Sequence, residues 1–339
     1  MTYRIAQWTL GNVGKVAVEV VREDPNLELV ACYTRPGEKT GKDVGELCGI
    51  GPIGLLTVSS VEEVIAAKPD LVLYMPLLWD VDAMVRLLES GVNVISTANF
   101  ITGYSYGPGE KERLHQAAVR GGVSLYGTGI NPGFADMLAA MATQLCRKVE
   151  KVSLLESVDA SAYDSPDTWR SLGFGGPKDA PGLMEQVRQR AGVFADAVEM
   201  IADALKVKLD DIIFEGELGV ATEDLDLGYM TIAKGMACGM KLHYIGVKDG
   251  KRVIDVATMT RLGQAMEPDW RPHHGYLIDV EGTPSVRCTF HTKESDAGAS
   301  SGLHTAMPAI NAIPAVMEAK PGLVLAGDLP LIVAAGRVG

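Results

Sequence analysis

The sequence is poor in cysteine and in basic residues. Its five cysteines are scattered over 339 residues, and no two of them form a C-x-x-C pair. Such an odd, dispersed set favours reduced thiols over a disulfide framework or a zinc site. The 31 basic residues are outnumbered by 43 acidic ones, for a formal net charge of −12. A surface this acidic repels phosphate backbones, so nucleic acid is not an expected partner.

Long apolar runs are also missing. None reaches the length that spans a bilayer, so no membrane association is expected. A strand pattern begins at Tyr3, which leaves no room for a signal peptide, and we expect a cytoplasmic protein. Aromatic residues make up only 6% of the chain, yet 47% of it is hydrophobic. This length and composition suit two globular domains.

The first third of the chain alternates short apolar runs with helical patterns. The predicted strands cover residues 4–8, 27–33, 70–74, 92–96 and 123–126, and the predicted helices cover 15–22, 81–90 and 110–120. This alternation is typical of a parallel sheet with right-handed crossovers. We therefore expect an α/β protein whose N-terminal Rossmann domain, a doubly wound parallel sheet, covers residues 1–135.

The pattern changes after about Arg147. Residues 183–206 predict one long helix, and Asp249-Gly250 between two apolar runs is a strong hairpin signal. A second hairpin is expected around residues 281–284. These features predict an α+β domain with a large open, mostly antiparallel sheet. An apolar face of such a sheet needs a cover, so a homodimer is expected.

Residues 9–14, Thr-Leu-Gly-Asn-Val-Gly, follow the first predicted strand and open a helix. This is the context of the dinucleotide-binding fingerprint, in which glycine backbone meets a pyrophosphate at a helix N-terminus. Thr9 stands where the first glycine of that fingerprint is usual. The alternative is an ordinary strand-to-helix turn. The residues expected to contact the cofactor here are Thr9, Gly11, Asn12, Val13 and Gly14.

The second predicted strand ends without the carboxylate that holds the ribose hydroxyls in NAD-preferring sites. Arg35 follows it and can pair with a 2′-phosphate through its planar guanidinium. Lys39 and Lys42 add positive potential, the alternative being a solvated basic loop. We expect NADP(H) as the preferred cofactor and NAD(H) as the alternative. Pro76 and Thr97 follow the third and fourth strands, where parallel sheets bind ligands, and are further expected cofactor contacts.

Three stretches together resemble one family: residues 8–14, the segment Gly-Thr-Gly-Ile-Asn-Pro-Gly-Phe at 127–134, and residues 307–316. The order and spacing of these three stretches resemble those of the dihydrodipicolinate reductase-like family. The resemblance is greatest to its 2,4-diaminopentanoate dehydrogenases and native amine dehydrogenases. The resemblance implies a substrate-binding and dimerisation domain over residues 136–304. It implies that residues 305–339 return to the Rossmann domain. It also implies hydride transfer between nicotinamide and a C=N or C=O carbon.

The later two stretches supply further candidates. Asn131 can offer a donor and an acceptor to the nicotinamide carboxamide, or it forms a turn or helix cap. Asn311 lies among apolar residues and needs a partner, either cofactor or backbone. Phe100, Phe134 and Tyr163 are expected in an apolar substrate pocket, the alternative for Phe134 being a core aromatic.

The sequence departs from this family at the residue expected to exchange a proton with the substrate. The amine dehydrogenases of this family carry a glutamate just beyond the fourth strand, whereas residues 98–109 here contain no acid. Asn99 can orient a substrate but cannot exchange a proton near neutral pH. Tyr163 and His304 are the candidate proton donors, with a pocket wall and a surface histidine as the alternatives. His273-His274 lacks a third ligand, so no metal is expected.

The leading hypothesis is an NADP(H)-dependent oxidoreductase that acts on a small, mostly apolar carbonyl, imine or amine. An alcohol or hydroxy-acid dehydrogenase without amine chemistry is one alternative, which the missing glutamate favours. A non-catalytic NADPH-binding sensor is another.

Overall fold

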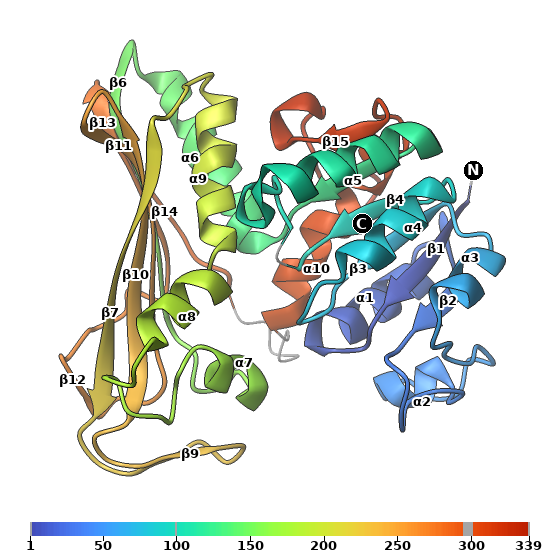
Figure 1. Cartoon of the computed structure of the whole chain (residues 1–339), viewed down its shortest axis with the longest axis horizontal. Helices are drawn as coiled ribbons and strands as arrows, with labels where there is room; N and C mark the ends of the chain where they lie inside the picture. Colours follow the sequence, from blue (N-terminus) through green and yellow to red (C-terminus); the bar gives the residue numbers. More distant parts are fainter. Residues whose placement is uncertain (1, 99, 294–300, 338–339) are drawn as a thin grey trace. The chain divides into compact units, whose positions relative to one another are not determined.

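The computed structural model describes residues 2–98, 100–293 and 301–337. The chain divides into two compact units (Figure 1). Unit 1 contains residues 1–134 and 294–339, and unit 2 contains residues 135–293. The C-terminal segment thus belongs to the same unit as the N-terminal third of the chain.

Unit 1 is built on a six-stranded sheet in the order β15-β5-β4-β3-β1-β2, in which every pairing is parallel. Its strands are β1 (Tyr3–Trp8), β2 (Leu27–Tyr33), β3 (Leu71–Tyr74), β4 (Asn93–Ser96), β5 (Ser124–Gly127) and β15 (Gly322–Val324). Its α-helices are α1 (Asn12–Glu23), α2 (Val44–Cys48), α3 (Val61–Ala66), α4 (Val81–Glu89), α5 (Gly107–Gly121), α10 (Ser301–Asn311) and α11 (Ile313–Met317). The predicted Rossmann architecture is confirmed.

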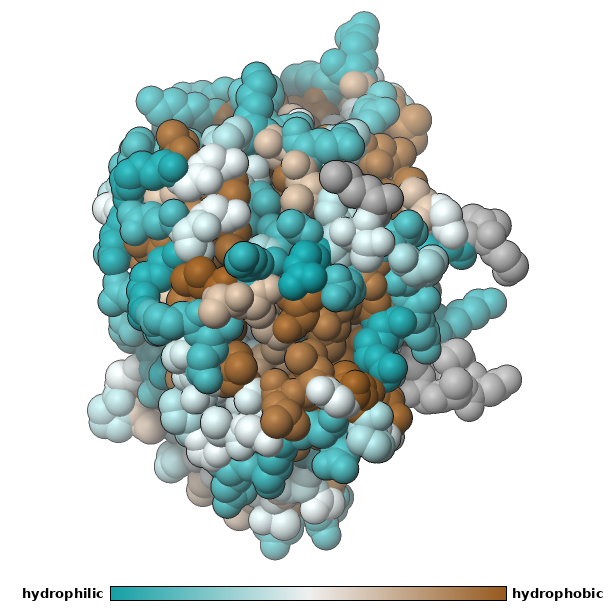
Figure 2. Space-filling model, turned by 90° about the vertical axis from the view of Figure 1, so that its right-hand side faces the viewer, coloured by the Kyte–Doolittle hydropathy of each residue, from teal (hydrophilic) through white to brown (hydrophobic). Residues whose placement is uncertain are grey.

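Two apolar clusters cover the two faces of this sheet. One packs Met84, Leu88 and Leu114 of α4 and α5 against the strands. The other packs Val21 of α1 with Ile310 and Ile313 of the C-terminal helices. All residues of β3 and β4 are buried, as expected for parallel strands covered on both faces. Apolar surface also reaches the exterior of unit 1, near the centre of the face shown in Figure 2.

Unit 2 contains a seven-stranded sheet in the order β12-β7-β10-β11-β6-β13-β14, in which only β11 and β6 pair in parallel. The strands are β6 (Lys148–Asp159), β7 (Asp211–Ala221), β10 (Ala237–Lys248), β11 (Lys251–Arg261), β12 (Met266–Glu267), β13 (Gly275–Thr283) and β14 (Val286–Phe290); β8 (Leu225–Asp226) and β9 (Thr231–Ile232) form a separate ribbon. The predicted large, mostly antiparallel sheet is confirmed. Asp249 and Gly250, with φ of 51° and 71°, form the turn of the predicted hairpin.

The helices of unit 2 lie on one side of its sheet (Figure 1). They are α6 (Ala135–Ala142), α7 (Pro166–Ser171), α8 (Leu183–Arg190) and α9 (Val193–Ala204). The prediction of a single helix over residues 183–206 is wrong, because the helix is interrupted between Arg190 and Val193. Gly192 lies at that break, and glycine is a poor helix former.

Candidate active site

The turn between β1 and α1 has an unusual first residue. Thr9 adopts a φ of 72°, a left-handed conformation that costs a non-glycine residue about 1–2 kcal/mol. Its hydroxyl donates a hydrogen bond to the Met75 carbonyl at 3.1 Å, and Gln7 Nε2 donates to the Thr9 carbonyl at 3.0 Å. These bonds hold the backbone in the conformation that the first glycine of the fingerprint would otherwise supply.

The two glycines of the turn differ in their surroundings. A Cβ atom added to Gly14 would clash with the Thr9 carbonyl and lie 2.8 Å from Gln7 Nε2. Gly14 therefore serves the packing of α1 on β1. A Cβ added to Gly11 would meet nothing within 4 Å, and the φ of −84° there suits any residue. Since neither packing nor strain requires glycine at position 11, the open space beside it fits an external ligand.

The N-terminus of α1 is suited to an anion. Gly11 is its N-cap, no described side chain caps the helix, and the first turn holds no acidic residue. The amide groups and the positive end of the helix dipole are therefore directed at the turn. Asn12 is exposed and Val13 is half-buried there. Gly302 of α10 packs closely, because a Cβ on it would lie 2.8 Å from the Asn12 carbonyl.

The residues that follow β2 carry positive charge without acidic partners. Thr34 is 3% exposed, and its hydroxyl has no hydrogen-bond partner among the described residues. Arg35 is exposed and forms no ion pair within the described part of the chain. Lys39 Nζ donates to the Leu10 carbonyl at 3.3 Å, which ties this loop to the glycine turn. A buried hydroxyl beside an unpaired guanidinium suits a phosphate group.

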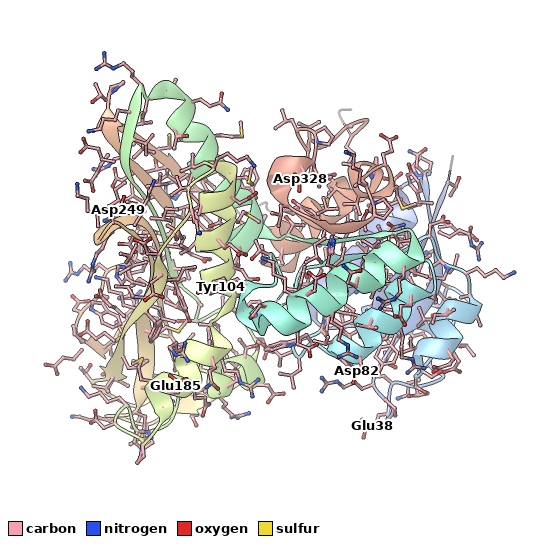
Figure 3. All side chains as sticks on the ribbon, turned by 45° about the horizontal axis from the view of Figure 1, so that its top comes forward. Glu38, Asp82, Tyr104, Glu185, Asp249 and Asp328 are labelled. Atoms are coloured by element: carbon pink, nitrogen blue, oxygen red, sulfur yellow. The ribbon has the colours of Figure 1, made fainter. Side chains whose placement is uncertain are left out.

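A surface pocket of about 540 Å³ adjoins this loop. Its lining residues are Arg35, Leu78, Trp79, Asp80, Val81, Asp82, Glu110 and Arg113. Asp82 lies in the first turn of α4, on the side of unit 1 that also carries Glu38 of the β2 loop (Figure 3). Arg113 is neutralised by Asp82 and Glu110, so the unpaired cation of the pocket is Arg35 among the residues described.

Aromatic rings fix the strand ends beneath this pocket. The Trp8 ring stacks on Tyr33, with centroids 3.9 Å apart, and on Tyr74 at 5.3 Å. The Tyr74 hydroxyl accepts a hydrogen bond from the Asp80 amide at 2.8 Å. Burial raises the pKa of Tyr74 above its ordinary value. The carboxyl ends of β1, β2 and β3 are thereby held together as one rigid edge.

Most of the predicted cofactor contacts meet at that edge. Pro76 follows β3 and is buried, and the Thr97 amide, after β4, donates to the Tyr74 carbonyl at 3.1 Å. Asn131 lies in the irregular segment η2 (Ile130–Phe134) that follows β5 and is half-buried. Phe134 closes this segment and is 50% exposed, so its ring has surface to offer a ligand.

Other predicted site residues lie differently. Phe100 is 1% exposed and packs in the core of unit 1, tilted against Tyr106, so the structure gives it a packing role. His304 lies inside α10 and is half-buried. Asn311 is the half-buried last residue of α10. Asn99 lies outside the described residues. The roles predicted for the last three stay predictions.

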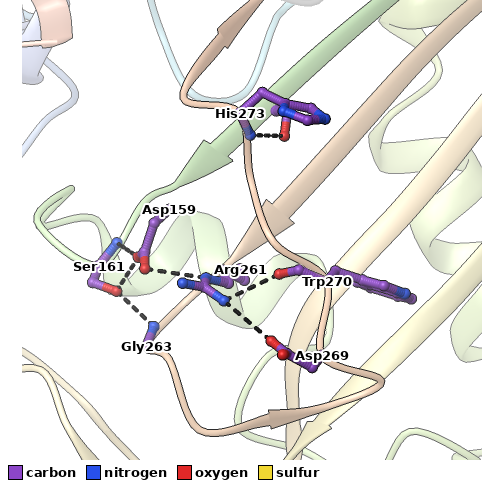
Figure 4. A network of polar contacts seen from close by, with 8 residues as sticks. Asp159, Ser161, Arg261, Gly263, Asp269, Trp270 and His273 are labelled. Atoms are coloured by element: carbon purple, nitrogen blue, oxygen red, sulfur yellow. Dashed lines mark hydrogen bonds and ion pairs between the residues drawn. The ribbon is translucent and has the colours of Figure 1, made fainter.

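Tyr163 lies in unit 2, in the loop that follows β6. A buried arginine, Arg261, anchors Asp159 at the end of that strand (Figure 4). Arg261 Nε contacts Asp159 at 3.2 Å, and Asp159 also accepts hydrogen bonds from Ser161. Burial alone would raise the pKa of Asp159, but the Ser161 bonds and the Arg261 charge lower it below its ordinary value. The two strand ends that carry these residues are thus joined.

Tyr163 itself is held by its neighbours. Trp169 Nε1 donates to the Tyr163 carbonyl at 3.0 Å, and the two rings meet edge to face with centroids 5.8 Å apart. The side chain is half-buried. A ring fixed in this way suits the wall of a pocket.

The sequence did not predict one hydrogen-bonded pair of side chains in unit 2. The Tyr276 hydroxyl donates to Glu156 Oε1 at 2.9 Å, across strands β13 and β6. Asp136, which is fully buried, lies close enough for its charge to act on Tyr276. The available signal was an acid inside the apolar strand pattern Leu154-Leu155-Glu156-Ser157-Val158. No group of three His, Cys, Asp or Glu is placed to hold a metal ion in the described parts of the chain. None of the described helices has the length and apolarity to cross a bilayer.

The parallel sheet and its glycine turn define unit 1 as the nucleotide-binding domain of a nicotinamide-dependent dehydrogenase. Residues 9–95 match the family model of the dihydrodipicolinate reductase N-terminus, and residues 134–337 match that of the 2,4-diaminopentanoate dehydrogenase C-terminal domain. The second match covers more than half of the chain. The protein therefore belongs to the 2,4-diaminopentanoate dehydrogenase family, and the predicted family is confirmed.

Individual relatives agree with this assignment. An amine dehydrogenase of Streptomyces virginiae is 30% identical, over 98% of this chain and 97% of its own. A 2,4-diaminopentanoate dehydrogenase of Acetoanaerobium sticklandii is 26% identical, over 74% of this chain and 70% of its own. The solved structure of an amine dehydrogenase from Mycobacterium smegmatis has the same fold. It superposes with a TM-score of 0.83 at 17% identity, over 98% of this chain and 97% of that one.

The different surroundings of the two glycines predict different phenotypes. Gly11→Ala should change the free energy of unfolding by at most about 1 kcal/mol, the scale of an N-cap change. It should weaken pyridine nucleotide binding, because its methyl group occupies the ligand's space. Gly14→Ala should destabilise the protein by about 1–3 kcal/mol through overpacking. Urea unfolding and calorimetric titration with NADPH measure both effects, and wild-type nucleotide affinity in Gly11→Ala would contradict the assignment.

Proposed function

We propose that the protein is an NADP(H)-dependent dehydrogenase of small, mostly apolar amines, which it interconverts with the corresponding ketone or imine. The observation that carries the proposal is the open space beside Gly11 at the N-terminus of α1. A pyrophosphate in that space would accept hydrogen bonds from the first-turn amides. The names of both curated relatives indicate amine substrates for those proteins.

The residues after β2 support NADP(H) over NAD(H). A 2′-phosphate at this tip would accept a hydrogen bond from the buried Thr34 hydroxyl and pair with the Arg35 guanidinium. Lys39, anchored on the Leu10 carbonyl, adds a second positive charge. Leu78 and Trp79 would provide apolar walls for the adenine ring.

Further contacts are proposed within each unit. Asn131 would hold the nicotinamide carboxamide, and the exposed Phe134 ring would face the substrate. Tyr163 would form a pocket wall, as its packing on Trp169 suggests. The bound nicotinamide would supply or accept the hydride. The protein groups orient the substrate and exclude water around the reacting carbon.

The second face of the unit 2 sheet supports a homodimer. The strand register places Leu155 and Leu277 opposite each other on this face, and both are half-buried. Charged side chains of both signs surround them, including Lys151 and Asp255. A face that mixes apolar and complementary charged groups suits a self-complementary two-fold contact with a second copy of this chain.

If the proposed activity is correct, ketone reduction by this enzyme should depend on ammonia. Incubation with NADPH and a small ketone should consume NADPH only when ammonia is present and should yield the amine. The reverse reaction should reduce NADP⁺ with a small primary amine. Absorbance at the NADPH band and product chromatography measure both directions. Ammonia-independent consumption with an alcohol product would instead favour an alcohol dehydrogenase, and tight binding without consumption would favour a sensor.

Arg35 should govern the choice of cofactor. Arg35→Ala should raise the KM for NADPH by about 10–100-fold, the scale of a lost charged hydrogen bond, and should leave the KM for NADH nearly unchanged. Arg113→Ala is the matched control, because its charge in the same pocket is already neutralised. Equal effects of Arg35→Ala on both cofactors would contradict the phosphate role.

Size-exclusion chromatography with light scattering should show twice the chain mass of 36.1 kDa. Leu277→Lys, on the proposed contact face, should give monomers, because it would bury an unpaired charge. Leu331→Lys, at a position in unit 1 that is 73% exposed, should leave the dimer intact. A monomeric wild-type protein would refute this contact.

A further inference from the structure

The connection between β2 and α3 in unit 1 is longer than such connections usually are, yet its backbone is firmly held. Its last part, residues 55–58, lies beside the end of β2, because the Thr34 amide donates to the Val58 carbonyl at 2.9 Å. The other edge of this segment bonds the middle of the connection, where the Thr57 amide donates to the Lys42 carbonyl at 2.9 Å. Ordered connections of this length usually carry function.

A carboxylate closes the middle of this connection. Asp43 Oδ1 accepts a hydrogen bond from the Gly45 amide at 2.8 Å, and Oδ2 accepts one from the Gly54 amide at 2.7 Å. Both oxygens also accept from the Ile53 amide, at 3.0 and 3.1 Å. Burial alone would raise the pKa of Asp43, but these amide bonds lower it below its ordinary value. The ionised carboxylate therefore fixes residues 43–54 as one unit.

Lys39 is held at both of its ends within this framework. The Thr57 hydroxyl donates to the Lys39 carbonyl, and Thr57 is 3% exposed. At the other end, Lys39 Nζ donates to the carbonyl of Leu10, the residue before Gly11, at 3.3 Å. The ammonium forms no ion pair within the described part of the chain, so its charge is available to a ligand. A lysine that is already ordered loses less side-chain freedom when it binds an anion.

We propose that Lys39, positioned by Thr57, is a second specificity-determining residue for the 2′-phosphate of NADP(H). This assignment rests on the proposed function and deepens it, since that function gives the phosphate to Thr34 and Arg35. A phosphate monoester carries close to two negative charges near neutral pH, which one guanidinium alone does not balance. Residues 55–58 bond both Thr34 and Lys39, so one segment sets the place of both groups.

A neighbouring lysine provides a matched control. Lys42 lies in the same connection, its side chain is exposed like that of Lys39, and its carbonyl accepts from the Thr57 amide. Among the described residues its ammonium contacts neither the glycine turn nor an acid. Lys42→Gln therefore removes the same charge from the same loop without touching the proposed phosphate position.

The test compares the Kd values of NADPH and NADH, measured by calorimetric titration of the whole protein without turnover. Lys39→Gln keeps a hydrogen-bond donor but loses the charge. It should raise the Kd of NADPH about 10-fold, the lower scale of a charged hydrogen bond, and change that of NADH less than about twofold. Adenosine 2′,5′-bisphosphate should lose affinity by the same factor as NADPH, whereas 5′-AMP should not. Lys42→Gln should leave all four values unchanged.

Variants of Thr57 test the positioning role. Thr57→Val should raise the Kd of NADPH by a smaller factor, because it loosens Lys39 without removing its charge. Thr57→Ser keeps the hydroxyl and should restore wild-type affinity. In the Lys39→Gln background, Thr57→Val should have no further effect on NADPH, because residues that act through one contact are not additive. Equal losses for NADPH and NADH in Thr57→Val would show a structural role alone and contradict the positioning.

Other outcomes decide the assignment of Lys39 itself. A Lys39→Gln protein with wild-type NADPH affinity would overturn it. Equal weakening of NADPH and NADH in that variant would also overturn it, since Lys39 would then only support the glycine turn. Failure of the proposed cofactor choice is distinct, because the wild-type protein would then bind 5′-AMP as tightly as adenosine 2′,5′-bisphosphate, which would remove the phosphate role of both Arg35 and Lys39.

Discussion

The close approach of α1 to the end of β1 is the constraint on which the nucleotide-binding edge depends. It requires a residue without a side chain at position 14 and a left-handed backbone at position 9. Threonine meets the second requirement because its hydroxyl is bound to the loop after β3. The same bond joins the first and third strand ends, so the turn, the Trp8 stack and the pocket beside Arg35 form one rigid edge.

The charge beside the glycine turn is opposite in sign to the net charge of the whole chain. The chain carries a formal net charge of −12, yet the loop after β2 presents Arg35 and Lys39 beside the N-terminus of α1. Arg113 in the same pocket is cancelled by two acids. A small anion is therefore attracted to one place, whereas an extended polyanion meets repulsion over the rest of the surface. This contrast suits a single nucleotide and disfavours a nucleic acid.

The two faces of the unit 2 sheet differ in composition. Charges on one face are paired with neighbours, as Asp255 is with His243 and Lys151. The helix-covered face is mostly apolar, and the Tyr276 hydroxyl donates a hydrogen bond to Glu156 on it. The two faces therefore differ in the residues that they carry.

The sequence by itself determined the structural features that depend on residues close together along the chain. Apolar periodicity predicted the parallel strands, the Asp249-Gly250 pair predicted its hairpin, and the glycine turn predicted the nucleotide fold, because each is set within a few residues. It did not reveal the helix break near Gly192, because a long apolar pattern masks a local kink. Only the tertiary structure decided that Phe100 packs in the core and that Glu156 meets Tyr276, because partners 120 residues apart leave no local pattern.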